Sequence, residues 1–504
     1  MKYFGLVLLS SVAGLAMAAG AQAADLPTKA PPAPPATSCY ARFYSWLDST
    51  AADCPLSYMG ITVYGVIDVG AGYETNAARF NPVYPNGVSE LINKFNNGAR
   101  WQLVPNGLSQ SNVGIKIKEQ IAPNWYVIGD VNAGFDPYSL QFANGPQSAA
   151  MNNPNPLASQ TANGDSSRTY GWDNSRAYLG ISNPTLGTLT GGRQYALTND
   201  TYANYDPFGG AYAFSLIGTS GTVLKGTGDT ELARYNTSVK YQVAYNGFRA
   251  GALYQLGGWD QGNGSNGAAQ VDVGADFAGF SVDGIYAYAK DAVKLDTFGG
   301  SAIPAGDPAD TLKATLANVN AGVLLTKYKW NALTVYGGYE YARLSDPSDD
   351  YGASPTATGD FLNSLNGGYP GVVQKLAYVT PEVLQVLWLG AKYGIRSDLD
   401  VAVGYYYEWQ NNYTSQYTSY NIGTSCGPNG GVNGPAIPGA TPQGSNSSAC
   451  AGNTRVVSGM IDWRPVKRLD VYAGVMYSRV AGGMANGFIN SSNIAPTAGM
   501  RLSF

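Results

Sequence analysis

The sequence predicts an all-β protein, a sixteen-stranded antiparallel β-barrel that spans a membrane. Three observations lead to this prediction. Segments of about ten residues alternate apolar and polar side chains, as in a strand with one face in lipid and the other in water. The connections between these segments are alternately short and long. Charged residues make up 13% of the 504 residues, about half of the roughly 25% that is usual in soluble domains.

Overall hydropathy does not reveal such a protein. Hydrophobic residues are 44% of the chain and the mean hydropathy is -0.15, values that alone would indicate a soluble protein. In a membrane barrel only every second residue of a strand faces lipid, so the signal of each segment is weak. Beyond the N-terminus, no apolar run is long enough to cross a membrane as a helix.

Residues 1–23 are predicted to be a signal peptide. Lys2 supplies the positive start, an apolar stretch follows, and Ala21–Ala23 fits the small-x-small cleavage rule. A retained membrane helix is the alternative, which is disfavoured because Ser and Gly interrupt the run and because the run is short for a span. The mature chain should begin near Ala24.

Residues 24–58 are expected to form a periplasmic N-terminal segment. Its start, ADLPTKAPPAPPA, is too rich in proline for a sheet interior and should be an extended tether. A short helical turn is expected between Cys39 and Cys54. Export to an oxidising compartment favours local disulfides, Cys39 with Cys54 and Cys426 with Cys450. A metal site is disfavoured because no C-x-x-C spacing occurs, and we expect neither a metal nor a cofactor.

Residues 59–504 are expected to form the barrel. In ITVYGVIDVGAGY, most odd positions from Ile61 to Tyr73 are apolar and most even positions are polar or glycine, which is the pattern of a half-buried strand. The same alternation predicts strands at 60–75, 109–119, 125–136, 174–183, 187–196, 232–244, 247–257, 269–278, 280–291, 315–329, 332–344, 385–396, 399–410, 454–464, 469–480 and 492–504.

The connections favour a membrane barrel over a soluble fold. Turns such as APN, YNG and WN are short, whereas the loops 76–108, 137–173, 345–384 and 411–453 are long. Short periplasmic turns and long extracellular loops are typical of bacterial membrane barrels. A soluble sandwich of two sheets is the alternative, but it would place many Arg and Lys side chains in a core. A barrel wide enough to hold water avoids this cost.

The composition excludes whole classes of function. The chain contains no histidine, so Ser-His-Asp hydrolysis, His-ligated zinc and imidazole acid-base chemistry are impossible. We therefore do not expect an enzyme. The formal net charge of -4 gives no reason to expect nucleic acid as a partner.

Alternation along the strands also predicts which charges face the lumen. Outward Leu179 places Arg176 on the inner face of its strand, and outward Tyr235 and Thr237 place Arg234 there. By the same reasoning the inner wall carries Lys116, Lys118, Lys240, Arg249, Arg501, Asp68 and Asp130.

Arg193 is a special case among these candidates. Strict alternation from Leu189 puts Arg193 on the outer face, but a bulge at Gly191 and Gly192 would turn it inward. An unpaired arginine on the lipid face would cost roughly 2 to 4 kcal/mol at mid-membrane.

The last eight residues, TAGMRLSF, keep the alternation of a strand up to the last residue. Phe504 is expected to face lipid on a closing strand, because a closed barrel leaves no free edge. Gly499, Leu502 and Phe504 resemble the C-terminal signature of outer-membrane barrels that their assembly machinery reads. That machinery is therefore an expected partner during biogenesis.

Several longer stretches carry a family resemblance. CPLSYMGITVYGVIDVGAGY, SRAYLGISNPTLGTLTGGRQYA, ARYNTSVKYQ, YGGYEYARLSDP and GMRLSF resemble Gram-negative general porins, and more narrowly those of alpha-proteobacteria such as rhizobia. The resemblance implies an outer-membrane channel for passive diffusion of ions and small hydrophilic solutes. It also implies a homotrimer in contact with outer-membrane lipid and lipopolysaccharide.

The same resemblance implies a pore constriction. The third long loop, about residues 196–231, would fold into the lumen, with Asp200 and Asp206 facing the basic wall, and Arg193 would lie on the lumen side. The two cysteine-closed segments depart from the best-known enterobacterial porins. Two alternatives remain open, namely a substrate-specific channel with a lumenal binding site and an adhesin or structural barrel whose loops carry the function.

Overall fold

The computed structural model describes most of the barrel and part of what precedes it. The described residues are 38–77, 90–92, 98–138, 140, 175–217, 234–256, 267–297, 312–346, 348, 373–375, 377–416, 426, 449–486 and 488–504. The predicted signal peptide and proline-rich tether lie outside them, as do residues 218–231 of the expected inward loop.

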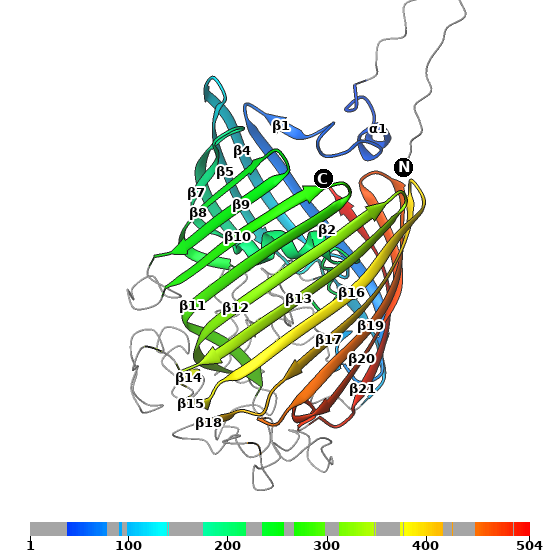
Figure 1. Ribbon diagram of the computed structural model, residues 1–504. Helices are drawn as coiled ribbons and strands as arrows, with labels where there is room; N and C mark the ends of the chain where they lie inside the picture. The colour runs from blue at the N-terminus through cyan, green and yellow to red at the C-terminus, as the bar shows by residue number, and fades with distance from the viewer. Residues whose placement is uncertain are drawn as a thin grey trace, which may run out of the picture.

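Sixteen long antiparallel strands form one closed barrel (Figure 1). Each pairs with the next along the chain, and the last pairs with the first through the register from Val66 opposite Ser503 to Gly72 opposite Thr497. The barrel strands are β2 (Ile61–Glu74), β4 (Asn112–Ala122), β5 (Trp125–Gly134), β6 (Ser175–Asn183), β7 (Gly187–Tyr195), β8 (Arg234–Tyr245), β9 (Phe248–Gln255), β10 (Ala268–Phe277), β11 (Phe280–Thr297), β12 (Leu312–Trp330), β13 (Leu333–Ser345), β16 (Glu382–Arg396), β17 (Leu399–Gln410), β19 (Gly452–Val466), β20 (Leu469–Gly482) and β21 (Ser492–Ser503). Each coincides with one predicted strand, so the fold class is confirmed.

Five short strands were not predicted from the sequence. They are β1 (Leu56–Tyr58), β3 (Arg100–Pro105), β14 (Val373–Lys375), β15 (Ala377–Thr380) and β18 (Thr414–Gln416). The predicted long connections 76–108, 345–384 and 411–453 therefore contain short strands. β3 pairs with the second half of β2, from Val69 to Glu74, whereas β4 pairs with the first half. Two strands thus share one long neighbour: β4 pairs with β2 only as far as Val66, and β3 satisfies backbone groups of β2 beyond that point.

The outer face of the barrel is apolar, as the alternation predicts. Leu179 is 59% exposed and Leu389 is 56% exposed, while their strand neighbours face inward. Tyr235 is an exception, since it was expected to face outward but is fully buried. Thr237 adopts a positive φ of 49°, and the pairing of β7 with β8 shifts its register at this point. This bulge turns Tyr235 inward.

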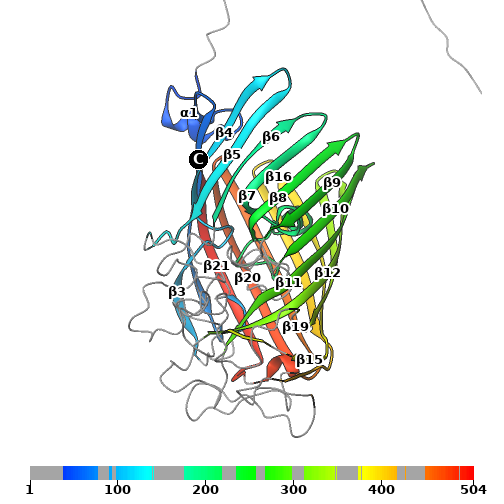
Figure 2. The same ribbon diagram turned by 90° about the vertical axis from the view of Figure 1, so that its left-hand side faces the viewer.

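Among the residues that the structure describes, the chain outside the strands forms short helices. These are α1 (Phe43–Leu47), α3 (Leu197–Thr201), η3 (Tyr202–Tyr205) and η6 (Gly483–Ala485). None of the helices in the described part of the chain is long and apolar enough to cross a bilayer. α1 is the helical turn expected between Cys39 and Cys54, and it lies at the end of the barrel that also holds the C-terminus (Figure 2).

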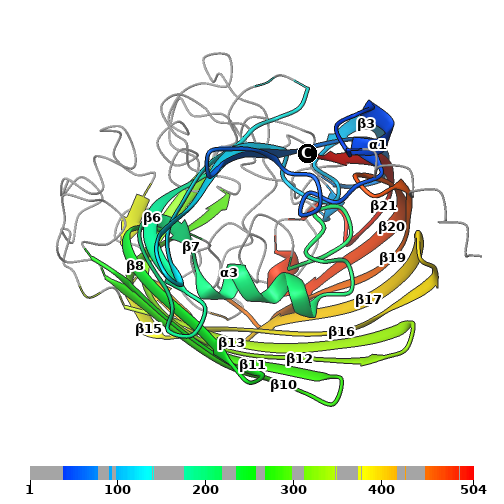
Figure 3. The same cartoon turned by 90° about the horizontal axis from the view of Figure 1, so that it is seen from above.

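Both expected cysteine pairs are joined. Cys39 is bonded to Cys54 and Cys426 to Cys450. The core of the molecule lies inside the barrel, where residues of α3, η3 and the following turn form a buried cluster with inward side chains of the wall. Figure 3 shows α3 within the ring of strands. The barrel therefore positions one segment across its own lumen.

Candidate pore constriction

Residues 197–217, here called the lumen segment, run from the end of β7 across the interior (Figure 3). At its start, the Leu197 backbone N–H donates to Gln270 Oε1 of β10 at 2.6 Å. At its far end, the Ala213 N–H donates to the Gly107 carbonyl at 2.9 Å. Gly107 follows β3 and lies near the place where β2 pairs with β21 and closes the barrel. The described part of the segment is therefore held at both ends. The part of the expected inward loop that the structure describes does fold into the lumen.

Tyr205 fixes the middle of the lumen segment to the wall. Its hydroxyl donates to the Asp283 carboxylate of β11, and its carbonyl accepts from Trp388 Nε1 at 3.0 Å. Arg249 Nη2 donates to Asp283 Oδ2 at 2.9 Å and to the Tyr205 hydroxyl at 3.1 Å. Arg249 therefore lies on the inner face, as predicted, where it binds the lumen segment.

Asp206 is a second attachment point. It is only 2% exposed, and its carboxylate accepts from the Tyr406 hydroxyl of β17 and from the Gly210 N–H, the latter at 2.8 Å. Burial raises the pKa of Asp206 to about 6. The expectation that Asp206 faces the wall cations through water is therefore not met, because its carboxylate is used inside the protein.

Two glycines of the wall let the lumen segment approach closely. A Cβ atom at Gly390 would lie 2.4 Å from Pro207 Cγ, and one at Gly404 would lie 2.7 Å from Phe208 Cε2. Such distances are too short for any side chain. We call the wall that bears Arg249, Asp283, Trp388, Tyr406 and these glycines the packed side of the lumen.

A second group of charges surrounds Tyr195 at the end of β7. The guanidinium carbons of Arg176 and Arg234 lie 4.6 Å and 4.8 Å from the centre of the Tyr195 ring. Lys240 Nζ donates to the Tyr195 carbonyl at 3.1 Å and to Asp200 Oδ2 at 2.7 Å. Burial raises the pKa of Asp200, and the charge of Lys240 opposes this shift. The structure thus brings these expected residues together, but Asp200 is already paired.

Arg176 also joins a network on the neighbouring strands. Its Nε donates to Asp130 Oδ2 at 3.0 Å and its Nη2 donates to the Tyr64 hydroxyl at 2.9 Å. The Tyr64 hydroxyl in turn donates to Asp130 Oδ1 at 2.6 Å. Arg176 and Asp130 therefore both face the lumen, as predicted, and neutralise each other.

Two lysines on β4 remain in water. Lys116 Nζ lies 4.3 Å from the Tyr64 ring centre and Lys118 Nζ lies 5.0 Å from the Tyr126 ring centre. Both residues are exposed, and within the described ranges neither forms a salt bridge. We call the wall of Tyr64, Lys116, Lys118, Asp130 and Arg176 the open side of the lumen.

The remaining predicted wall residues have different surroundings. Asp68 is fully buried and accepts from the Leu108 N–H and the Tyr472 hydroxyl, both at 2.7 Å. Arg501 Nε pairs with Asp470 Oδ2 at 2.9 Å. Arg193 is half-buried, and Gly191, Gly192 and Arg193 pair with β6 without a register shift. The bulge next to them lies in the pairing of β7 with β8, and its extra residue belongs to β8, so the lumen side of Arg193 stays a prediction.

Sequence reasoning missed several lumen residues. Asp283, Trp388 and Tyr406 occupy inward positions of their strands, so the same alternation that places Asp68 and Asp130 on the inner wall also applies to them. A row of four ion-paired residues was also missed, with nitrogen–oxygen distances of 3.2, 2.9 and 2.8 Å along Lys392, Asp400, Arg464 and Asp462. Asp462 lies opposite Tyr472, whose ring is 6.1 Å from that of Phe214 in the lumen segment, so this row faces the interior.

Comparison with known proteins adds to this geometry. The profile of a family described as Gram-negative porin matches residues 7–482. A curated relative, an outer membrane porin protein of Bordetella pertussis, is 23% identical over 210 residues, which cover 40% of this chain and 44% of the relative. The match thus spans less than half of that protein.

Two solved structures are similar in fold. The anion-selective porin from Comamonas acidovorans is 14% identical, with coverage of 88% of this chain and 99% of that one and a TM-score of 0.51. Outer-membrane expressed OmpT of Vibrio cholerae is 13% identical, with coverage of 89% and 100% and a TM-score of 0.50. At such identities the likeness concerns the fold alone.

Proposed function

This chain belongs to the Gram-negative porin family, and from that premise we propose that it is an outer-membrane channel for passive diffusion of ions and small hydrophilic solutes. The observation that carries the proposal is the pair Lys116 and Lys118. Their side chains occupy inward positions of β4 and yet are exposed, which is possible for charged groups only where the lumen holds water. The lumen segment narrows this water-filled space from the packed side.

The charge balance supports a preference for anions. On both sides of the lumen the acids are neutralised or buried, with Asp130 bound to Arg176, Asp200 to Lys240, Asp283 to Arg249, and Asp206 inside the protein. Lys116, Lys118 and Arg234 have no acidic partner among the described residues. Fixed charges act strongly where water is scarce and screening is weak. An anion passing the constriction would therefore meet a more favourable wall than a cation.

Planar-bilayer recording of the purified protein under a salt gradient tests both statements. Open channels with a reversal potential of the sign expected for anion preference would support them. A reversal potential of the opposite sign would reject the anion preference while leaving the channel in place. Absence of open channels would reject the channel and favour the adhesin or structural barrel.

A substrate-specific channel is the second candidate. The guanidinium groups of Arg176 and Arg234 lie against the Tyr195 ring and form a cationic site on the lumen wall. Such a site would suit a planar anion. Conductance that saturates with one solute at low concentration would favour this reading. Conductance that rises in proportion to salt would favour free diffusion.

The expected partners and the finer family assignment remain proposals. We propose a homotrimer, and the alpha-proteobacterial subfamily, on the sequence stretches that carry the resemblance. Outer-membrane lipid, lipopolysaccharide and the barrel-assembly machinery are proposed as contacts on the same ground. Chemical cross-linking of the protein in native membranes would test the trimer, since a ladder that stops at three protomers is expected.

A further inference from the structure

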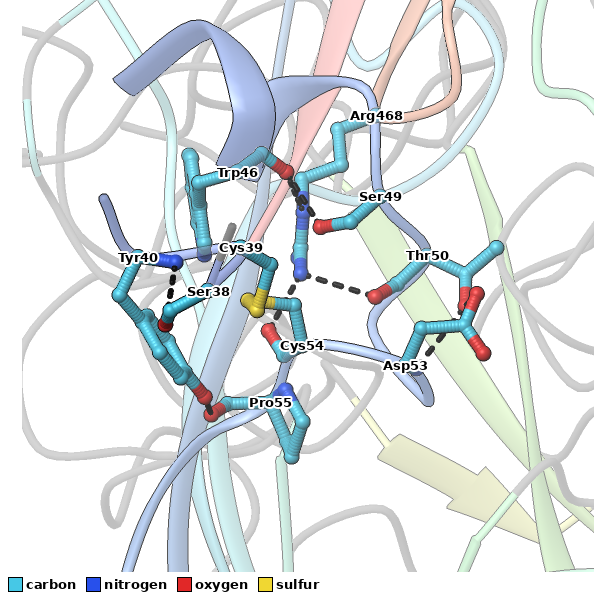
Figure 4. The surroundings of a disulfide bond; sticks show 10 residues. All are labelled: Ser38, Cys39, Tyr40, Trp46, Ser49, Thr50, Asp53, Cys54, Pro55 and Arg468. Carbon is cyan, nitrogen blue, oxygen red and sulfur yellow. Dashed lines mark hydrogen bonds between the residues drawn. A yellow bond between two sulfur atoms is a disulfide. The ribbon is translucent and has the colours of Figure 1, made fainter. Parts of the chain in front are cut away.

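Residues 38–58, here called the N-terminal cap, enclose one side chain of the barrel (Figure 4). The Cys39–Cys54 disulfide closes the cap around α1. Arg468, in the turn between β19 and β20, reaches into it. Arg468 Nε donates to the Trp46 carbonyl at 2.9 Å, and Nη2 donates to the Thr50 carbonyl at 3.0 Å.

The groups of the cap that bind the Arg468 side chain are backbone carbonyls and an aromatic ring, all of them neutral. Arg468 Nη2 also donates to the Cys54 carbonyl at 2.6 Å, and the guanidinium carbon lies 4.3 Å from the centre of the Trp46 ring. Arg468 is 2% exposed, and it forms no salt bridge within the part of the chain that the structure describes. Burial lowers the pKa of Arg468, but an arginine keeps its charge at neutral pH. A buried charge is tolerated only where hydrogen bonds replace its water.

The cap also lies across the seam where the barrel closes. β2 extends beyond the end of β21, because the pairing of these strands stops at Val66 opposite Ser503, and Phe504 exchanges two backbone hydrogen bonds with Gly65. β1 pairs with the remaining residues, from Ile61 to Val63. An edge of β2 that would otherwise be open is thereby covered.

On the other flank of the seam the cap holds the last hairpin. The Arg468 N–H donates to the Leu47 carbonyl at 3.2 Å, and the Arg468 carbonyl accepts from the Ser503 N–H at 2.9 Å. The cap therefore touches the first barrel strand through β1 and, through Arg468, the turn before β20 and the end of β21.

We propose that the N-terminal cap is a clasp that holds the barrel seam closed, with Arg468 as the residue it grips and the Cys39–Cys54 disulfide as the condition for the grip. The three carbonyls that bind Arg468 come from residues 46, 50 and 54, which the disulfide ties to the start of the cap. Once the disulfide is opened, these carbonyls are no longer held in one place. The cap then loses its grip on Arg468, and β1 is held only by its pairing with β2. The seam is then free to open from the end of β21.

Hydrogen exchange of the folded protein in detergent micelles tests the clasp. Arg468→Ala should accelerate exchange in the seam peptides, residues 61–66 and 497–504, by about tenfold, since a hydrogen bond to a charged group contributes about that factor. Peptides of the β11–β12 hairpin, far from the seam, should not change. Lys467→Ala is the matched control, because Lys467 is an exposed cation in the same turn and its removal should leave the seam unchanged.

A second measurement does not depend on whether Arg468→Ala folds. In a Cys426→Ser, Cys450→Ser protein only Cys39–Cys54 remains, and dithiothreitol can be added after folding is complete. Reduction should reproduce the exchange pattern of Arg468→Ala. The clasp is refuted if neither treatment speeds exchange at the seam, or if exchange rises equally in the β11–β12 hairpin, which would indicate general loss of stability.

Discussion

The packed and open sides of the lumen carry similar residue types but use them differently. On the packed side, Arg249 and Asp283 bind each other and the hydroxyl of Tyr205, so their charges hold the lumen segment. On the open side, Lys116 and Lys118 are exposed and lie over aromatic rings, and they form no salt bridge among the described residues. A charge that is paired and buried contributes to the fold, whereas a charge left in water sets the potential that a solute meets. Substitutions on the two sides should therefore have different consequences.

The largest effect is expected from reversing the open side. Lys116→Glu combined with Lys118→Glu should change the ratio of anion to cation permeability by about tenfold toward cations, because Coulomb energies exceed ~1 kcal/mol where screening is weak. The measurement is the reversal potential in a bilayer under a salt gradient. Lys467→Glu, in an exposed turn outside the lumen, serves as the control. An unchanged reversal potential in the double variant would show that ions do not pass close to the open side.

A larger side chain on the packed side should change the width of the pore. Gly390→Val would push Pro207 away from the wall, since even a Cβ atom there lies 2.4 Å from Pro207 Cγ. We expect a lower single-channel conductance and a loss of about 1 to 3 kcal/mol in stability from overpacking. Gly322→Val is the control, because a Cβ atom at Gly322 meets no atom within 4 Å. Equal conductance in both variants would mean that the lumen segment does not limit the current.

A direct comparison of two arginines sharpens the contrast. Arg234→Ala should shift the reversal potential toward cations by a few-fold change in permeability ratio, with little change in thermal stability, because Arg234 stacks on Tyr195 without an acidic partner among the described residues. Arg249→Met should lower thermal stability more, because it leaves Asp283 buried without its cation. Selectivity from bilayer recording and heat-dependent gel mobility give the two readouts. The distinction between the two sides would be contradicted if Arg234→Ala lowered thermal stability more than Arg249→Met did and left selectivity unchanged.

The smallest expected effect is the pH dependence of the attachment at Asp206. The pKa of about 6 in the folded protein exceeds the usual value of about 4, so the folded state binds more protons between these values. Stability therefore falls as the pH rises through this window and is constant above it. Asp206→Asn should reduce the difference in thermal transition between about pH 4.5 and about pH 7. If the difference in thermal transition between the two pH values is as large in Asp206→Asn as in the unmodified protein, other carboxylates are responsible for it.

The sequence predicts the wall far better than the contacts across it. Alternation of period two locates all sixteen barrel strands, because lipid and water impose it on every one of them. It misses β1 and β3, which are too short to show a period. It also fails at Tyr235, because the bulge at Thr237, a residue with positive φ, turns Tyr235 inward.

The partners of the site residues could not be read from the chain. Asp200 and Asp206 are six positions apart in one loop and were expected to play the same part. One meets Lys240 and the other meets Tyr406, 200 residues away along the chain. Which of two similar acids is buried depends on the curvature of the whole barrel, and local pattern carries no information about that.

The lumen segment is supported at Gln270 and again at Gly107, with Tyr205 tied to the wall between them. In mechanical terms the lumen segment is a beam supported at both ends, whereas a loop fixed at one end would be a cantilever. A cantilever swings with thermal noise and with an applied field, but a beam bends only as far as its supports allow. The opening beside it should consequently keep one width over time, and the current through it should be steady.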